Sequence, residues 1–481
     1  MNWLRRLIKA ATRTYDIAQP SRHWDVHFST ADNSDADSLI SESLQKARAR
    51  CRYEVRNNSY AKGIIQSFAN DIIGTGPTLQ LKTPNEAFNA EVERRWGDWG
   101  DACDLSGRQT LEDMLQLAIM QGCEAGEAIF TYGRNPAAQK GMPSLGLMMF
   151  EPDLIDTPWG FNNDPKVIMG VRVDDYGRPV EYYVLKDHPG KSNAGGLGMD
   201  YTTLKAEQVL HLLKVERPGQ TRGMPWLTPA IPLFAFMRQY TLAVIQAAKN
   251  AANFSAVMQS DAPVGGAAAA EEFETLDIES GSMLTLPQGW QMSQLKAEQP
   301  VQTYEMFKRE ILSEIARCIC MTSNVAAADS SRHNYASGRL DWQVYFRHIC
   351  VIRNWMTKRI LNPILNLWLQ EAMLMDNYIT TGIERIEPSM IEWYWPGIEH
   401  VDPQKEANAQ QTRLSAFTTS LSAEYARQGK DWRKELEQIA IEQQYLKDKG
   451  IKTEPIPTTE KIDDEEDDKT EDRRLSRIRV S

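Results

Sequence analysis

Apolar residues recur every three or four positions along the first part of the chain, which is the spacing of helices that bury one face. The pattern predicts helices at residues 44–73, 85–99 and 111–123, with a kink in the first at 56–58. A short β-forming run at 78–81 predicts a strand between them. The stretch 29–43, rich in Ser, Asp, Asn and Ala, lacks this period. We therefore expect a loop there and a folded body that starts near residue 44.

Beyond Glu127 the pattern changes to short runs of β-branched and aromatic residues separated by Asp, Gly, Pro and Asn. Such runs predict strands in a mixed or antiparallel sheet. The predicted strands are at 128–132, 145–150, 167–173, 180–185 and 209–213. Helices followed by such a sheet predict a helix-rich α+β fold.

A second helical region follows the sheet. Thr228-Pro229 is a helix-start signal, and the apolar run after it predicts a helix over 228–258, about 45 Å long at about 1.5 Å per residue. The run 260–301 then resembles a small hairpin excursion, with strands at 282–286 and 290–295. Further helices are predicted at 304–320 and at 339–369, the latter bent near Pro363. A polar surface loop at 321–338 separates these two.

Turn and capping residues divide the C-terminal part clearly. After a β-like run at 391–395, Asp402-Pro403 opens a helix that ends at Gly429, and Asp431 opens one that ends at Gly450. They are predicted to form a helical hairpin. The tail from Lys452 combines an acidic block with a basic end and is predicted to be disordered. Residues 1–17 place Trp, Leu and Ile beside Arg and Lys, which could indicate an amphipathic membrane anchor or a targeting peptide. The hydrophobic run is too short for a secretion signal, and a surface helix is favoured.

Composition narrows the class of protein. The 481 residues include 42% hydrophobic and 25% charged residues, so the chain folds, and into several subdomains. The net charge of -11 argues against a broad basic face that grips DNA phosphates. Six cysteines without regular spacing favour a reducing cytoplasm. Charged and polar residues interrupt the most apolar stretch, 231–254, so no transmembrane helix is expected.

The sequence offers little chemistry. His333 lies beside Ser330 and Ser331, but no Gly-x-Ser-x-Gly elbow exists, and sequence neighbours are rarely oriented for nucleophilic attack. Cys318 and Cys320 would point about 200° apart on a helix, which favours buried structural thiols over a metal site. A phosphate-binding loop with Lys is absent from the sequence. We therefore predict no catalytic, cofactor-binding or metal-binding residues, and a protein that is not an enzyme.

The order of these elements and three stretches of sequence resemble the portal proteins of lambda-type tailed bacteriophages. The stretches are 215–230 (VERPGQTRGMPWLTPA), 326–340 and 395–407, which runs from Trp-Pro-Gly into Asp-Pro-Gln-Lys-Glu-Ala. An Arg-Asn-Asn element at 56–58 and the pair Trp96 and Trp99 also match. The resemblance spans roughly residues 44–450.

The resemblance implies a portal-like architecture of wing, stem, clip and crown, assembled as a ring with a central channel. The implied parts are an N-terminal arm (1–43), the wing (44–225), a stem helix (226–258), the clip (259–303), a second stem helix (304–320), a tunnel loop (321–340), a channel helix with the remaining wing (341–400), the crown hairpin (401–450) and the tail (451–481).

The resemblance also implies a function. A ring, expected to be a homododecamer, would form the channel at one capsid vertex for packaging and ejection of double-stranded DNA. Its implied partners are the terminase large subunit, the major capsid and scaffold proteins and a head-tail adaptor, without a membrane. The implied locations are the virion and, during assembly, the host cytoplasm. An acidic channel wall would repel the polyanion and leave few sticking points.

The tunnel loop is the expected place of weak, sequence-independent DNA contact. Its candidate residues are Asn324, Ser330, Ser331, Arg332, His333 and Asn334. Arg332 and His333 are the candidates for phosphate contact. Two alternatives stay open: a structural capsid or head-tail adaptor protein, and a phage enzyme that processes DNA or capsid protein.

Overall fold

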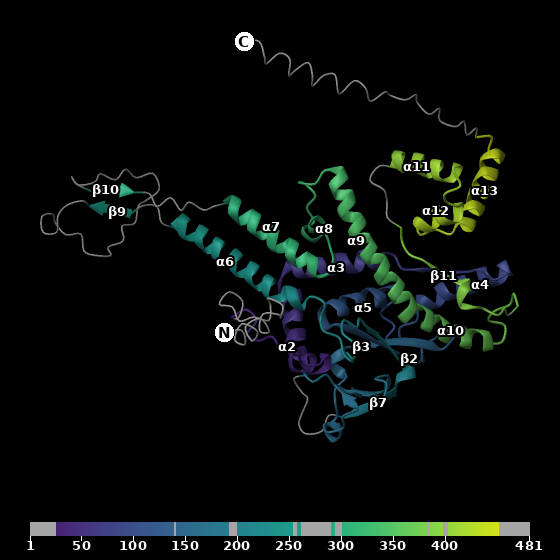
Figure 1. Cartoon of the computed structure of the whole chain (residues 1–481). Coiled ribbons are helices and arrows are strands. Elements are labelled where there is room, and N and C mark those ends of the chain that lie inside the picture. The colour runs from purple at the N-terminus through teal and green to yellow at the C-terminus, as the bar shows by residue number, and fades with distance from the viewer. Residues whose placement is uncertain are drawn as a thin grey trace, which may run out of the picture. The chain divides into compact units, whose positions relative to one another are not determined.

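The computed structural model describes residues 26–138, 141–191, 200–253, 257–260, 290–293, 301–382, 384–397 and 403–451. The arm at 1–17, the strand predicted at 282–286 and the tail from Lys452 lie outside these residues. The chain divides into two compact units, Met1–Pro396 and Gly397–Ser481. Figure 1 shows that helices dominate the described residues and that strands accompany them, which confirms the helix-rich α+β class.

Two helices open the first unit. Helix α2 (Ala36–Asn57) is capped by the Asp35 side chain, and α3 (Ser59–Ile73) is capped by Asn58, which also ends α2. The kink predicted at 56–58 is therefore confirmed. The loop predicted at 29–43 and the body start near 44 are wrong, because α2 begins at Ala36. Ala36, Ile40 and Leu44 are buried at helical spacing, a period that the intervening Ser and Glu residues obscure.

The next elements agree with the sequence pattern. Strand β1 (Thr78–Leu81) precedes α4 (Glu86–Gly100) and α5 (Leu111–Ala125), and Thr110 and Asp113 form a capping box at the start of α5. Strand β1 pairs antiparallel with the distant β11 (Ile391–Tyr394), so that Gln80 lies opposite Glu392. This pairing brings the C-terminal end of the first unit next to its N-terminal helices.

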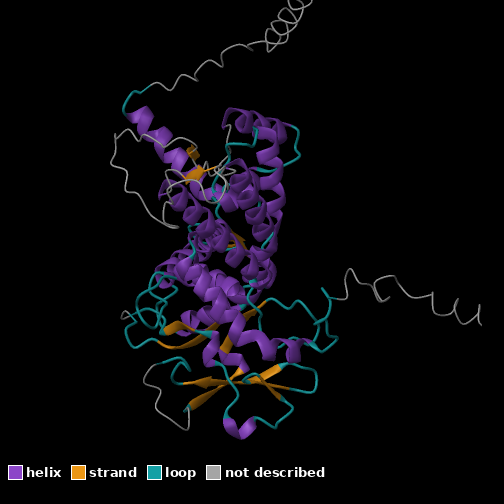
Figure 2. Cartoon of the chain, turned by 90° about the vertical axis from the view of Figure 1, so that its left-hand side faces the viewer, coloured by secondary structure: helices purple, strands orange, loops and turns teal. Residues whose placement is uncertain are grey.

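Two antiparallel sheets follow, and their strands lie close together in Figure 2. The three-stranded sheet has β2 (Glu127–Arg134) between β3 (Leu145–Phe150) and β8 (Val209–Leu213). The four-stranded sheet has the order β4 (Val167–Ile168), β5 (Val171–Val173), β6 (Pro179–Leu185) and β7 (Tyr201–Lys205). The strand predicted at 167–173 is two strands, because Met169 and Gly170 have positive φ and reverse the chain. Strand β7 was missed, since it buries no residue.

Helices α6 (Ile231–Asn253) and α7 (Val301–Cys318) lie side by side in Figure 1. The Tyr240 ring contacts Tyr304 and Phe307 of α7, with centroids 5.7 Å and 4.7 Å away. The helix predicted to reach residue 258 is too long. It ends at Asn253, and β9 (Val257–Ser260) instead pairs antiparallel with β10 (Trp290–Ser293). Strand pairing therefore overrides the continuous helical pattern there.

The remaining helices of this unit are α8 (Ser323–Ala327), α9 (Tyr335–Met356), the π-helical turn η6 (Thr357–Leu361) and α10 (Asn362–Leu374). The loop predicted at 321–338 is therefore shorter, because α8 occupies part of it and α9 begins at Tyr335. The bend predicted near Pro363 corresponds to the π turn just before this proline. Short 3-10 turns lie at η2 (Pro152–Leu154), η3 (Trp159–Phe161), η4 (Ala206–Gln208), η5 (Thr228–Ala230) and η7 (Pro388–Met390).

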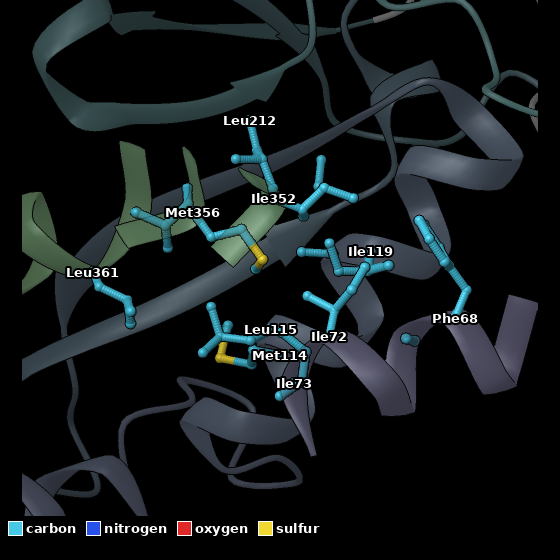
Figure 3. Close-up of a cluster of buried hydrophobic side chains, with 14 of the residues drawn as sticks. Phe68, Ile72, Ile73, Met114, Leu115, Ile119, Leu212, Ile352, Met356 and Leu361 are labelled. Carbon is cyan, nitrogen blue, oxygen red and sulfur yellow. The ribbon is translucent and has the colours of Figure 1, made fainter. Parts of the chain in front are cut away.

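The main core joins these helices to the three-stranded sheet. Figure 3 shows Ile72 of α3, Ile119 of α5, Leu212 of β8 and Met356 of α9 converging on one cluster. All four side chains are buried. None of the described helices is both long and apolar enough to span a membrane.

The second unit contains α11 (Pro403–Ser415), α12 (Leu421–Arg427) and α13 (Trp432–Asp448). The predicted two-helix hairpin is thus three helices. The first predicted helix breaks because Phe417 adopts a positive φ of 54° and Ser420 caps a new helix.

Candidate functional site

The candidate tunnel loop is a short connection between two helices. Ala328, with φ of 52°, ends α8, and the Asn334 side chain accepts a hydrogen bond from the Ser337 N–H at 2.8 Å and caps α9. Both ends of the loop are therefore anchored by helix termini. Within it, the Asp329 carboxylate accepts from the Ser331 N–H at 2.9 Å.

The structure brings most of the predicted loop residues together. Ser330, Ser331, Arg332 and Asn334 are exposed in this connection and His333 is half-buried. Asn324 is different, because it lies within α8 and its Oδ1 atom is buried without a hydrogen-bond partner among the described residues. It does not share the exposed surface of the loop.

Each of the two proposed phosphate contacts already faces a carboxylate. The Arg332 guanidinium donates to Glu305 on α7. His333 Nε2 lies 3.6 Å from Asp341 Oδ2 on α9. Hydrogen bonds from Ser331 lower the pKa of Asp329, so the loop also carries a carboxylate of its own. The loop therefore presents little net positive charge to a polyanion.

A buried ionic cluster lies at the start of the three-stranded sheet. Glu127, the first residue of β2, is fully buried, and its Oε1 accepts from Arg222 Nε and Arg48 Nη2, both at 2.8 Å. Its Oε2 accepts from the Gly223 N–H at 2.7 Å and lies 2.9 Å from His211 Nε2. Both carboxylate oxygens are thus satisfied inside the protein.

Arg222 extends this cluster to the second sheet. Its Nη2 donates to the Pro152 carbonyl at 2.7 Å, and its Nη1 donates to the Ile155 carbonyl at 3.0 Å and to the Met169 carbonyl. One side chain therefore joins both sheets to the segment that leads into α6. Burial alone raises the pKa of Glu127, but the positive charges of Arg222, His211 and Arg48 outweigh it and hold this pKa well below its usual range.

Two glycines allow this segment to pack against the start of β2. Gly126 has φ of 90°, and a Cβ on it would lie 2.4 Å from the Met224 carbonyl carbon. A Cβ on Gly223 would lie 2.3 Å from the Gly126 carbonyl oxygen. Only backbone fits between them. The sequence pattern indicates the stretch 215–230 but not Gly126 and Glu127, against which it packs. The feature that could have indicated them is a Gly-Glu pair between the predicted helix at 111–123 and the predicted strand at 128–132.

Comparison with known proteins identifies the family. The family described as phage portal protein, lambda family, matches residues 27–353, which is most of the chain. The chain belongs to the lambda family of phage portal proteins. Its Arg222-Gly223 segment and its loop both lie within the matched residues, and the predicted resemblance is confirmed.

Known portal proteins match nearly the whole length. A probable portal protein of Halomonas phage phiHAP-1 is 25% identical over 448 residues, which cover 87% of this chain and 84% of that protein. Portal protein B of Escherichia phage lambda is 20% identical over 468 residues, which cover 86% of each. Among solved structures, a chain in the virion of a native gene transfer agent particle is 13% identical, with a TM-score of 0.48, and the match covers 84% of this chain and 98% of that chain.

One group in this portal protein has the composition of a metal site. Glu151, Asp153 and His188 each offer a ligand atom within 4.8 Å of the others. His188 Nδ1 accepts from the Gly190 N–H at 3.0 Å, and His188 Nε2 lies 2.9 Å from Glu151 Oε2. Arg52 also donates to Asp153 at 2.5 Å. Asp153 is thus already paired with an arginine, whereas His188 Nε2 is buried and makes no hydrogen bond with any described residue.

A cavity of about 350 Å³ is lined partly by Trp226, Cys318, Cys320 and His348. Burial raises the pKa of Cys318 and lowers the pKa of His348, so both groups are neutral at pH 7. The Cys318 thiol donates to the Trp226 carbonyl at 3.1 Å. A thiolate paired with an imidazolium is therefore not formed here. Both cysteines are half-buried, not buried as predicted.

Proposed function

We propose that this portal protein assembles as a ring, expected to be a dodecamer, around a channel for double-stranded DNA. The channel would serve genome packaging and ejection at one capsid vertex. The observation that carries this proposal is the family match over residues 27–353. The exposed apolar side chains of α6 and α7 support it, because Phe236, Leu242 and Met306 are more than half exposed in one chain. Such surface is typical of an interface with other chains.

The parts of the chain take proposed roles in that ring. Helices α6 and α7 would form the stem, and the segment between them, residues 259–303, the clip. Residues 44–225 with part of 341–400 would form the wing, and 401–450 the crown. These assignments rest on the resemblance and on the order of the elements.

The loop between α8 and α9 is proposed to face the channel. Its exposed Ser330, Ser331 and Asn334 offer neutral polar groups, and its cations are paired with carboxylates. Contact with DNA there would be weak and independent of sequence. A duplex can slide past such a surface, since few charges hold its phosphates.

Further partners are proposed on the same basis: the terminase large subunit, the major capsid and scaffold proteins and a head-tail adaptor. We expect the protein in the virion and, during assembly, in the host cytoplasm. We also expect a structural role without catalysis, in keeping with the portal family.

Native mass spectrometry combined with single-particle imaging of the full chain tests this proposal. We expect a closed ring near twelvefold with an open axial channel. A stable monomer or dimer without a channel at micromolar concentration contradicts it.

A further inference from the structure

Helix α9 and the π turn after it divide sharply into a buried and an exposed face. Tyr345, Ile349 and Ile352 are buried in the main core. Five polar residues lie on the opposite side, and all are exposed. They are Arg339, Gln343, Arg347, Asn354 and Lys358, which we call the α9 ridge. At about 3.6 residues per turn these positions fall within an arc of about 100°, so they form one stripe.

The cations of the α9 ridge have no carboxylate partner. Arg339, Arg347 and Lys358 make no ion pair with any described residue. The acidic residue of α9, Asp341, lies off the ridge, beside His333. The tunnel loop is different, since Arg332 is bound to Glu305. The chain as a whole has a net charge of -11, so three unpaired cations on one helix face make this face positive in an otherwise acidic protein.

The spacing of the ridge suits an extended polyanion. From Arg339 to Lys358 the ridge is about 28 Å long at about 1.5 Å per residue. Duplex DNA carries about one negative charge per 1.7 Å of its axis, so phosphates are present along this whole length. The amides of Gln343 and Asn354 add neutral donors between the cations. Because its other face is packed in the core, the helix presents these groups without large rearrangement.

A strip of exposed apolar residues runs beside the α9 ridge. Leu340, Val344 and Val351 are exposed along the adjacent strip of α9. Exposed apolar side chains are expected to be covered by another copy of this chain, whereas an unpaired cation is costly to bury.

We propose that the α9 ridge binds the phosphate backbone of duplex DNA, and that it contributes more to DNA affinity than Arg332 and His333 of the tunnel loop do. This inference rests on the proposed function as a DNA channel. It adds the surface that the duplex contacts. The interaction is sequence-independent, because the ridge offers charges and amides for phosphates.

The test uses the assembled full-length protein and a fluorescent random-sequence duplex of about 30 base pairs, with affinity followed by anisotropy across a salt series. The ridge variant is R339Q/R347Q/K358Q. The matched control, K62Q/R108Q/R134Q, removes the same number of exposed positive charges elsewhere. A third variant, R332Q, tests the tunnel loop. Native mass spectrometry first establishes that each variant assembles as the parent does.

We expect the ridge variant to bind at least tenfold more weakly near 0.1 M salt. The slope of log affinity against log salt should flatten by about 0.9 for each phosphate that the variant no longer neutralises. The control and R332Q should stay within about threefold of the parent. Equal binding by the ridge variant and the control overturns the inference, and so does a larger decrease for R332Q. Neither result affects the portal proposal, which is judged by ring formation.

Discussion

Arg222 and Glu127 are joined by a hydrogen bond of 2.8 Å between Nε and Oε1 in the buried interior of the first unit. Their side chains are 1% and 0% exposed. Glu127 is the first residue of β2 in the three-stranded sheet, and Arg222 lies in the segment that leads into α6. A buried charge pair of this kind adds little net stability compared with an apolar pair, but breaking it leaves an uncompensated charge. The pair therefore makes the junction between the sheets and α6 sensitive to single substitutions.

Replacing Arg222 by leucine should destabilise the fold severely. Glu127 would lose its strongest favourable charge, and three backbone carbonyls would lose a donor. We expect a loss of about 3–5 kcal/mol in the free energy of unfolding, measured by urea denaturation of the first unit's transition. The same change at Arg94, whose ion pair with Asp98 is exposed, should cost less than about 1 kcal/mol. Similar losses for both variants would show that the cluster has no special role.

Gly223→Ala should also destabilise, for a different reason. Its Cβ would lie 2.3 Å from the Gly126 carbonyl oxygen, and backbone on both sides leaves no side chain to move away. We expect a loss of at least about 2 kcal/mol and a lower Tm. Gly63→Ala is the matched control, because a Cβ there meets nothing within 4 Å in the middle of α3. It should raise stability by about 0.5–1 kcal/mol.

The loop after α10 provides a prediction for pH. Burial raises the pKa of Glu91, but hydrogen bonds from Thr380, Thr381 and Arg95 outweigh it and lower this pKa to about 2. A carboxylate with a lowered folded pKa stabilises the fold above its unfolded pKa, and this contribution is lost as the pH falls. The stability lost in Glu91→Gln should thus be largest above about pH 4.5 and should shrink between about pH 4.5 and 2. Thermal melts of the parent and the Glu91→Gln variant across this pH range measure the difference in stability. A difference that does not change with pH would refute the role of the Glu91 charge.

Much of the fold follows from the chain itself. The capped helices and the alternating strands are local patterns, and α4, α5 and β3 appear where the sequence predicts them. Errors occur where a distant partner decides. Strand β9 continues a helical pattern but pairs with β10, and β7 has no buried residue to mark it. The helix broken at Phe417 shows the same limit, because a single residue with positive φ carries no signal in hydrophobic periodicity.

The candidate site was less accessible from the sequence. The loop and its residues are predicted from polarity and resemblance, but the carboxylates facing Arg332 and His333 come from α7 and α9, and no spacing rule indicates them. The stripe of cations on α9 becomes visible only when the buried face of that helix is known. Ionic partners distant in sequence, such as Arg48 and Glu127, need the fold before they can be paired.

The exposed apolar side chains of α6 should decide whether the chain assembles. Phe236 and Leu242 are 59% and 58% exposed on α6. In a ring they would be covered by a neighbouring copy, and burying each would contribute about 1.5–3 kcal/mol to assembly. Phe236→Ser combined with Leu242→Ser should therefore shift the protein from rings to smaller species, while the helix content of each chain stays unchanged. Analytical ultracentrifugation with circular dichroism measures both. Tyr176→Ser is the control, since that side chain is more exposed but lies in a turn of the four-stranded sheet. Rings that persist in the double variant would show that α6 does not contact neighbouring copies through this face.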